Sequence, residues 1–252
     1  MPPLVLAIEA STALLGVALV SRERVLCEVS LEKPRAHSSY LLPICMDVMD
    51  KVGVTKDDIS CIATSGGPGS FTGLRIGAAT AQGLGYSWDK PVVMVPAFQV
   101  YLYGAHLLPN VAVASGKASA QAVSGFYVRA SEGPLEDQWP TWGFREAVPV
   151  RPRDVRQFLE LLKETGENPV YVTGDGSSTL MQCPEREGLT LRLLDPYWGL
   201  PRPGVLGLIG ARMFEAGLSV TPQRALPDYM RLSQAEVRRA ENTGLPKRLD
   251  SR

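Results

Sequence analysis

The chain has 252 residues, of which 45% are hydrophobic and 21% are charged, as expected of a globular protein with one large core or two smaller ones. Its 26 lysines and arginines balance its 26 aspartates and glutamates, so no net charge draws it onto nucleic acid or an anionic membrane. A protein that grips RNA by itself is disfavoured, because such proteins are usually basic.

The first hundred residues alternate strand and helix patterns in a definite order. In chain order we predict strands at 4–8, 15–20 and 25–31, a helix at 38–52, a strand at 61–64, a helix at 74–88 and a strand at 92–95. The order β-β-β-α-β-α-β is typical of one half of the actin-like ATPase and sugar-kinase fold. A second series of similar elements follows, with strands at 111–114, 125–128 and 169–173 and helices at 154–164 and 205–216.

The most distinctive segment runs from Ser65 to Gly77 and contains four glycines and a proline within its first nine residues. This composition predicts a loop that leads into a helix, where exposed N–H groups can cradle an anion or another surface can approach closely. No Lys-Ser/Thr pair follows the glycines, and their spacing does not fit a dinucleotide fingerprint. The residues themselves leave the ligand of this loop open.

As a string, Gly-Pro-Gly-Ser-Phe-Thr-Gly-Leu-Arg-Ile-Gly at 67–77 closely resembles the signature of the bacterial TsaB (YeaZ) family, whose members take part in making threonylcarbamoyladenosine on tRNA. Other stretches that resemble the family lie at 4–20, 37–43, 171–176 and 226–231. The resemblance implies an α/β protein of the actin-like ATPase/sugar-kinase (ribonuclease H-like) fold with two related subdomains. The expected units are an N-terminal subdomain with dimerisation helices at 1–100, a more divergent subdomain at 101–205, a C-terminal helix and motif packing back at 206–240, and a polar tail at 241–252.

The resemblance also implies a function. Such a chain would be no enzyme on its own, but a cytoplasmic subunit that binds and activates the catalytic subunit TsaD, which modifies adenosine 37 of tRNA. Its expected partners are TsaD, the ATPase TsaE and, when alone, a second copy, with tRNA contacted only through the complex and no membrane. No cofactor is assigned, and ATP or ADP at the interface with TsaD stays open. The alternative is a stand-alone sugar-kinase-like ATPase or phosphotransferase.

Two helices are expected to carry the partner interface. Apolar side chains cover about 200° of the helix at 38–52, twice the stripe that one domain needs, although burial within a single domain is the alternative. In the helix at 74–88, small residues recur every four positions, a pattern that lets another helix approach closely. The family uses these helices for dimerisation and for docking on TsaD. The predicted contact residues are Leu41, Leu42, Cys45, Val48, Met49, Val52, Gly73, Gly77 and Ala81.

Candidate nucleotide or anion contacts lie in three turns. They are Ser11 in the first hairpin turn, Gly67, Gly69 and Arg75 in or after the Gly-rich loop, and Gly174, Asp175 and Gly176 after a strand. An intramolecular salt bridge is the alternative for Arg75, and a simple tight turn is the alternative for 174–176. TsaB-like chains commonly read Asp-Thr-Ser in the first turn, where this chain has Glu9 and Ala10, a difference that argues against metal-assisted nucleotide binding.

No catalytic residue and no metal ligand are predicted. The chain has two histidines, His37 and His106, which are far apart in sequence, whereas a metal site needs several converging ligands. We interpret His37 as part of a helix start. Near the C-terminus, residues 226–231 resemble a Pro-x-Tyr-Leu-Arg motif of the family, and the arginines that follow could contact tRNA or TsaD, with a solvated tail as the alternative.

Overall fold

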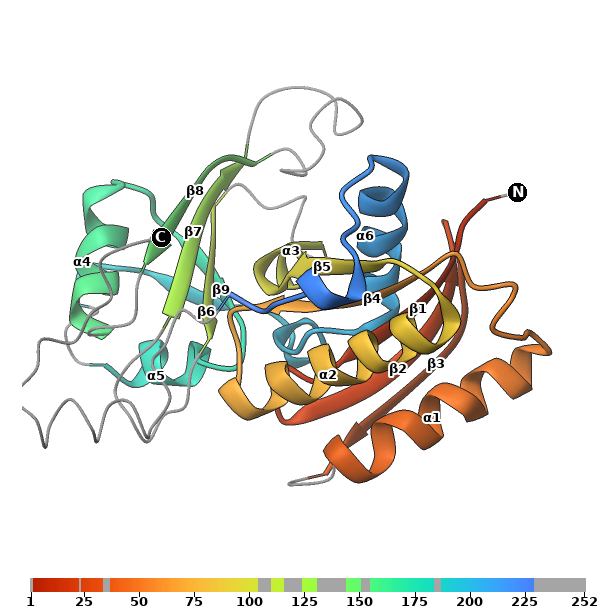
Figure 1. The fold of residues 1–252 in the computed structure, drawn as a ribbon. Helices are drawn as coiled ribbons and strands as arrows, with labels where there is room; N and C mark the ends of the chain where they lie inside the picture. Colours follow the sequence, from red (N-terminus) through yellow and green to blue (C-terminus); the bar gives the residue numbers. More distant parts are fainter. Residues whose placement is uncertain are drawn as a thin grey trace, which may run out of the picture.

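The computed structural model describes residues 2–22, 24–33, 37–103, 110–115, 124–130, 144–150, 155–183 and 187–228 (Figure 1). Its first half comprises β1 (Leu4–Glu9), β2 (Leu14–Ser21), β3 (Arg24–Glu32), α1 (His37–Val52), β4 (Cys61–Gly67), α2 (Phe71–Trp88), β5 (Val92–Pro96) and α3 (Ala97–Tyr103). Its second half comprises β6 (Asn110–Ser115), β7 (Ser124–Ala130), β8 (Phe144–Val150), α4 (Val155–Glu164), β9 (Val170–Thr173), α5 (Ser177–Gln182), β10 (Leu191–Leu193), α6 (Pro203–Glu215) and the short 3-10 helices η4 (Pro196–Gly199) and η5 (Pro222–Arg224).

The strands form two five-stranded sheets with the same topology. Sheet A has the order β3-β2-β1-β4-β5, and sheet B, taken from its other edge, has the order β8-β7-β6-β9-β10. In sheet A, β1 is antiparallel to β2 and parallel to β4; in sheet B, β6 is antiparallel to β7 and parallel to β9. The predicted fold class, an α/β protein of two related actin-like subdomains, is therefore confirmed.

Helices cover both faces of sheet A, because its central strands are apolar on both sides. Leu6 and Ile8 of β1 belong to a core with α1 and α2, whereas Val5 and Ala7 belong to a second core with α6. Figure 1 shows α1 and α2 together on one face of the sheet and α6 on the other. The described residues contain no helix that is long and apolar enough to cross a membrane.

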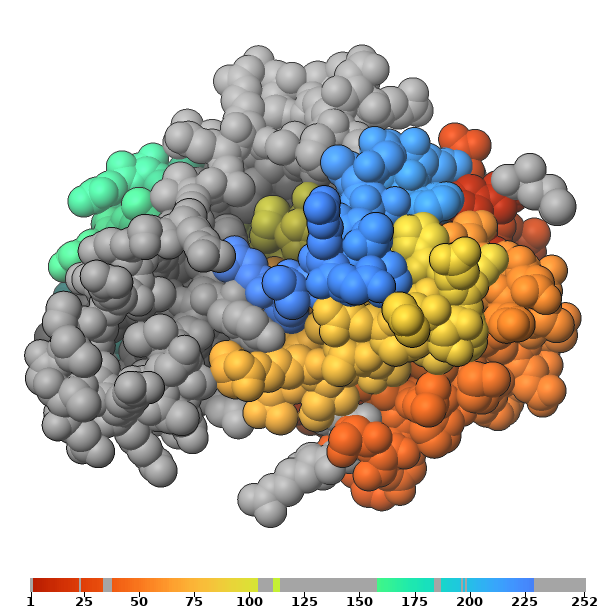
Figure 2. All heavy atoms as spheres, in the orientation of Figure 1, coloured from red at the N-terminus to blue at the C-terminus, as the bar shows by residue number. Residues whose placement is uncertain are grey.

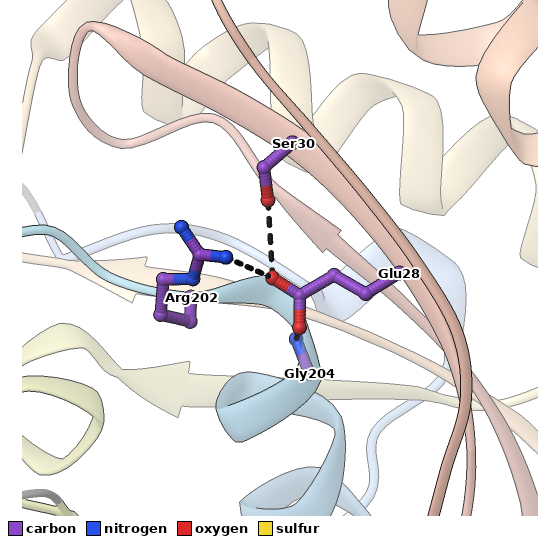
Figure 3. A network of polar contacts seen from close by, with 4 residues as sticks. All are labelled: Glu28, Ser30, Arg202 and Gly204. Atoms are coloured by element: carbon purple, nitrogen blue, oxygen red, sulfur yellow. Dashed lines mark hydrogen bonds and ion pairs between the residues drawn. The ribbon is translucent and has the colours of Figure 1, made fainter. Parts of the chain in front are cut away.

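A polar network ties the start of α6 to the edge strand β3 (Figure 3). One carboxylate oxygen of Glu28 accepts a hydrogen bond from the Ser30 hydroxyl (3.1 Å) and pairs with Arg202 (3.2 Å). The other accepts from the backbone N–H of Gly204 (3.2 Å), in the first turn of α6. Glu28 of strand β3 thus gives the first turn of α6 both a hydrogen-bond acceptor and a negative charge, which stabilise the start of a helix.

After α6 the chain returns across sheet A as a segment that we call the strap, residues 219–228. Val220 exchanges two backbone hydrogen bonds with Val92 at the edge of β5 (2.9 and 2.8 Å). The Gln82 side chain of α2 donates to the carbonyl of Ala225 (3.0 Å), and Ala225 itself is buried in the core beneath α1 and α2. The strap ends on the Gly-rich loop, where the Asp228 N–H donates to the Gly66 carbonyl (2.8 Å).

Candidate functional site

The Gly-rich loop packs directly onto the first hairpin turn. The Ser70 N–H donates to the Ser11 carbonyl (2.6 Å), and a Cβ atom on Gly69 would lie 2.7 Å from the Ser11 side chain. A Cβ atom on Gly73 would overlap the carbonyl oxygen of Ala10. Glycine is therefore required at both positions by close approach, and the turn at residues 10–12 is buried beneath the start of α2.

Glu9, the last residue of β1, points its carboxyl group into this closed region. The residue is fully buried, and its Oε1 accepts a hydrogen bond from the Ser11 N–H (2.5 Å). Its Oε2 and the hydroxyl of Ser65 have no hydrogen-bond partner among the described residues. Burial raises the pKa of the Glu9 carboxyl to about 7; contacts with Ser11 and Ala10 oppose this rise, and the negative charge of Asp175 adds to it.

Two groups from outside the first hairpin influence the charge of Glu9 or are influenced by it. Asp175 follows β9 of sheet B, and Tyr101 lies on α3, which follows β5 of sheet A. Burial raises the pKa of the Tyr101 hydroxyl, and the charges of Asp175 and Glu9 raise it further, so the three groups lie within electrostatic reach of one another. Ser65 follows Thr64, which pairs with Ile8 on the neighbouring strand, so it lies beside Glu9, and we call Glu9, Ser11, Ser65, Tyr101 and Asp175 the boundary cluster. It lies where β1, β4 and β9 end, the edge at which open α/β sheets commonly bind ligands.

Most of the other candidate anion contacts are buried or contact other parts of the chain. Gly67 has a positive φ of 101°, and a Cβ atom there would lie 2.5 Å from the Asp228 carbonyl oxygen, so this glycine makes room for the strap. Ser70 caps α2 by accepting a hydrogen bond from the Gly73 N–H (3.3 Å). The guanidinium of Arg75 is exposed and stacks over the Phe71 ring, 4.0 Å from its centroid. Gly174 and Gly176 are buried on either side of the exposed Asp175.

The structure places most of the predicted partner contacts inside the fold of this chain. Leu41, Cys45, Val48 and Met49 pack into the chain's own core, with Met49 only 3% exposed. The small-residue row of α2 also faces inward: Gly73 and Gly77 lie against Ala10 and Thr64 of the first hairpin and β4, and Ala81 is fully buried. Side chains buried in this way cannot contact a partner while the fold is intact. Val52 is half-buried, and Leu42 is 49% exposed.

The exposed sides of the two helices carry other residues, which the sequence analysis did not single out as contacts. Met46 lies one turn after Leu42 on α1 and is also 49% exposed. The outer row of α2 consists of Ala79, Gly83 and Tyr86, and Tyr86 is 75% exposed. We call Leu42, Met46, Ala79, Gly83 and Tyr86 the outer helix face. Ala79, Gly83 and Tyr86 are spaced by four and three residues, and this spacing in the sequence could have shown that they share one side of the helix.

The remaining sequence predictions fall partly outside the described residues. His106 and residues 229–252 lie outside, as does the tail proposed to contact tRNA. His37 is the first residue of α1. Among the residues that the structure describes, no group of three or more histidine, cysteine, aspartate or glutamate side chains could hold a metal ion.

Comparison with known proteins places these features in a family context. A family model described as TsaD, tRNA N6-adenosine threonylcarbamoyltransferase, matches residues 25–132. The tRNA threonylcarbamoyladenosine biosynthesis protein TsaB of Escherichia coli is 30% identical, over 90% of this chain and 94% of that protein. The protein of the same name from Bacillus subtilis is 28% identical over 94% of this chain and 98% of its own length. A Pseudomonas aeruginosa crystal structure described as similar to peptidase YEAZ superposes with a TM-score of 0.67 at 25% identity, covering 91% of this chain and all of that one.

Proposed function

Because the chain belongs to the TsaB (YeaZ) family, we propose that it is a non-catalytic subunit of tRNA threonylcarbamoyladenosine biosynthesis that binds and activates TsaD. It acts in the cytoplasm with TsaD and the ATPase TsaE, forms a homodimer when alone, and contacts tRNA only through the complex. Any ATP or ADP is held at its interface with TsaD. The family membership supports the pathway, and the surface of the chain supports the role within it.

One observation carries the proposed docking role, namely the outer helix face. Leu42 and Met46 leave about half of each side chain exposed on α1, although the same helix buries four other apolar side chains. On α2, a Cβ atom added to Gly83 would meet nothing within 4 Å, so a partner could approach this helix closely between Ala79 and Tyr86. Figure 2 shows α1 and α2 exposed together on one side of the molecule, beside the strap. An apolar surface of this kind suits a protein partner.

The closed hairpin turn supports the non-catalytic part of the proposal. A phosphate-binding turn needs free N–H groups and space for the anion. Here the turn at 10–12 is buried, its Ser11 N–H is bonded to Glu9, and the Gly-rich loop covers it. The turn therefore offers an anion neither a free Ser11 N–H nor open space, and the sugar-kinase-like alternative gains no support.

Reconstitution tests this proposal directly. We expect TsaD, TsaE and the enzyme that makes threonylcarbamoyl-adenylate to modify tRNA only when this chain is added, because the outer helix face must engage TsaD. Formation of the modified nucleoside is measured by mass spectrometry of digested tRNA, and ATP hydrolysis by this chain alone is measured in parallel. Undiminished modification without the chain, or ATP turnover by the isolated chain that depends on Glu9 and Asp175, would contradict the proposal.

A further inference from the structure

The closed turn after β1 buries a carboxyl group, and its surroundings offset only part of the cost of ionising that group. Residues 9–12 are all buried, and Gly69 and Gly73 press on the turn with no side chain between. Within this region, one oxygen of Glu9 accepts a hydrogen bond from the Ser11 N–H, and the other has no hydrogen-bond partner among the described residues. Contacts with the Ser11 side chain and the Ala10 backbone favour the ionised form but do not outweigh burial. An ionised carboxylate in such a position normally accepts two or three hydrogen bonds or pairs with a cation.

Of the groups outside the turn, Asp175 makes the ionised form of Glu9 still less favourable, and the neighbouring uncharged groups bring no positive charge. The loop after β9 contributes Asp175, whose negative charge repels a Glu9 carboxylate. Helix α3 contributes the buried phenol of Tyr101, and β4 contributes the uncharged hydroxyl of Ser65. The charged residue of the first turn of α2, Arg75, is exposed and lies over Phe71. The geometry therefore favours a neutral Glu9 as long as the turn stays closed.

We propose that Glu9 is a proton-controlled latch: its neutral form keeps the turn at 10–12 closed beneath the Gly-rich loop, and its ionisation loosens that packing together with the facing loop at 174–176. The latch links the two sheets, because Glu9 ends a strand of sheet A and Asp175 follows a strand of sheet B. It also links them to α2, since the loop that covers the turn leads directly into that helix.

The direction of the effect follows from the pKa of Glu9 in the two states. In the closed state burial raises the pKa to about 7, whereas in an open state with Glu9 in water it returns to its ordinary value of 4.5. A carboxyl group whose pKa is raised in the closed state stabilises that state most when the pH is below the ordinary pKa of 4.5. This stabilisation is lost as the pH rises through the closed-state pKa of about 7. Opening should therefore become about tenfold more frequent between about pH 6 and about pH 8.

Hydrogen–deuterium exchange on the full chain tests this proposal. After correction for the intrinsic exchange rate, we expect protection in peptides covering 10–12, 65–73 and 173–176 to fall about tenfold across that pH interval. In Glu9→Gln, which keeps the shape but cannot ionise, protection of the same peptides should not change with pH. Glu164→Gln, on the exposed end of α4, removes a carboxylate elsewhere and should retain the wild-type pH dependence.

A second variant keeps the proposal testable if Glu9→Gln fails to fold. Asp175→Asn removes the neighbouring negative charge, so the pKa of Glu9 in the closed state should fall while its value in the open state stays the same. The loss of protection should therefore level off at a lower pH and be smaller between about pH 6 and about pH 8. Constant protection in the wild-type chain would overturn the proposal. A transition that persists in Glu9→Gln, or one that Asp175→Asn leaves at the same pH, would overturn it as well.

Discussion

Replacing Gly73 with alanine is expected to lower the free energy of unfolding by about 3 kcal/mol or more. The added methyl group would overlap the carbonyl oxygen of Ala10, which is backbone and cannot rotate away. The start of α2 would therefore have to lift from the hairpin turn, and the contact of Gly69 with Ser11 would be lost with it. Denaturant unfolding followed by circular dichroism measures the change.

Gly83→Ala provides a matched control on the same helix. A Cβ atom there would meet nothing within 4 Å, so this variant should gain the higher helix propensity of alanine, about 0.5–1 kcal/mol. If Gly73→Ala were as stable as Gly83→Ala, the close packing of α2 on the first turn would be refuted. The pair also separates two interpretations of the glycine row, since a row that faced only a partner would show no loss of stability in the isolated chain.

Aspartate at Met49 should mainly lower stability, whereas aspartate at Met46 should mainly weaken binding to a partner, although the two residues lie three positions apart on α1. Met49 is 3% exposed, and an aspartate there would bury an unpaired carboxylate, with an expected loss of about 3–5 kcal/mol of stability. Met46 is 49% exposed, and Met46→Asp should change stability by less than about 0.5 kcal/mol. The same change should weaken binding to TsaD by about tenfold or more, because it places a charge in the proposed apolar interface.

Thermal unfolding and calorimetric titration with TsaD measure the two effects separately. Asp50→Asn, on the exposed side of α1, serves as a control that should alter neither stability nor affinity appreciably. A folded Met46→Asp variant that binds TsaD as tightly as the wild-type chain would remove Met46 from the interface. A fully stable Met49→Asp variant would contradict the packing of α1 on sheet A.

The sequence predicted the order of the main elements because their periodicity is strong and their boundaries carry glycine, proline or capping residues. It could not tell which side of a helix is covered. The apolar arc of α1 was predicted to be wider than one domain needs, but only the position of the sheet decides that Leu41 and Met49 are inside while Leu42 and Met46 are outside. A small-residue row fits a neighbouring helix as well as other parts of the same chain; here Gly73 lies against the first hairpin turn and Gly77 against that turn and β4.

Features that depend on distant segments were also missed. Helix α3, with seven residues, and strand β10, with three, are too short to show a periodicity. The sequence identified Glu9 as a departure from the family pattern, but the turn that follows it is closed by the loop at 65–73, more than fifty residues later in the chain. The contact between Asp228 and Gly66 joins positions that no local pattern relates.

The placement of α6 has a consequence for synthesis on the ribosome. Strands β1 to β5 leave the ribosome first, but the helix that covers Val5, Ala7 and Val20 is made only after all of sheet B. During this interval one apolar face of the nascent sheet lacks its cover, the condition under which chains aggregate or recruit chaperones. A premature stop just before Pro203 would therefore release a fragment that has all described strands of both sheets but leaves one apolar face of sheet A exposed and prone to aggregation.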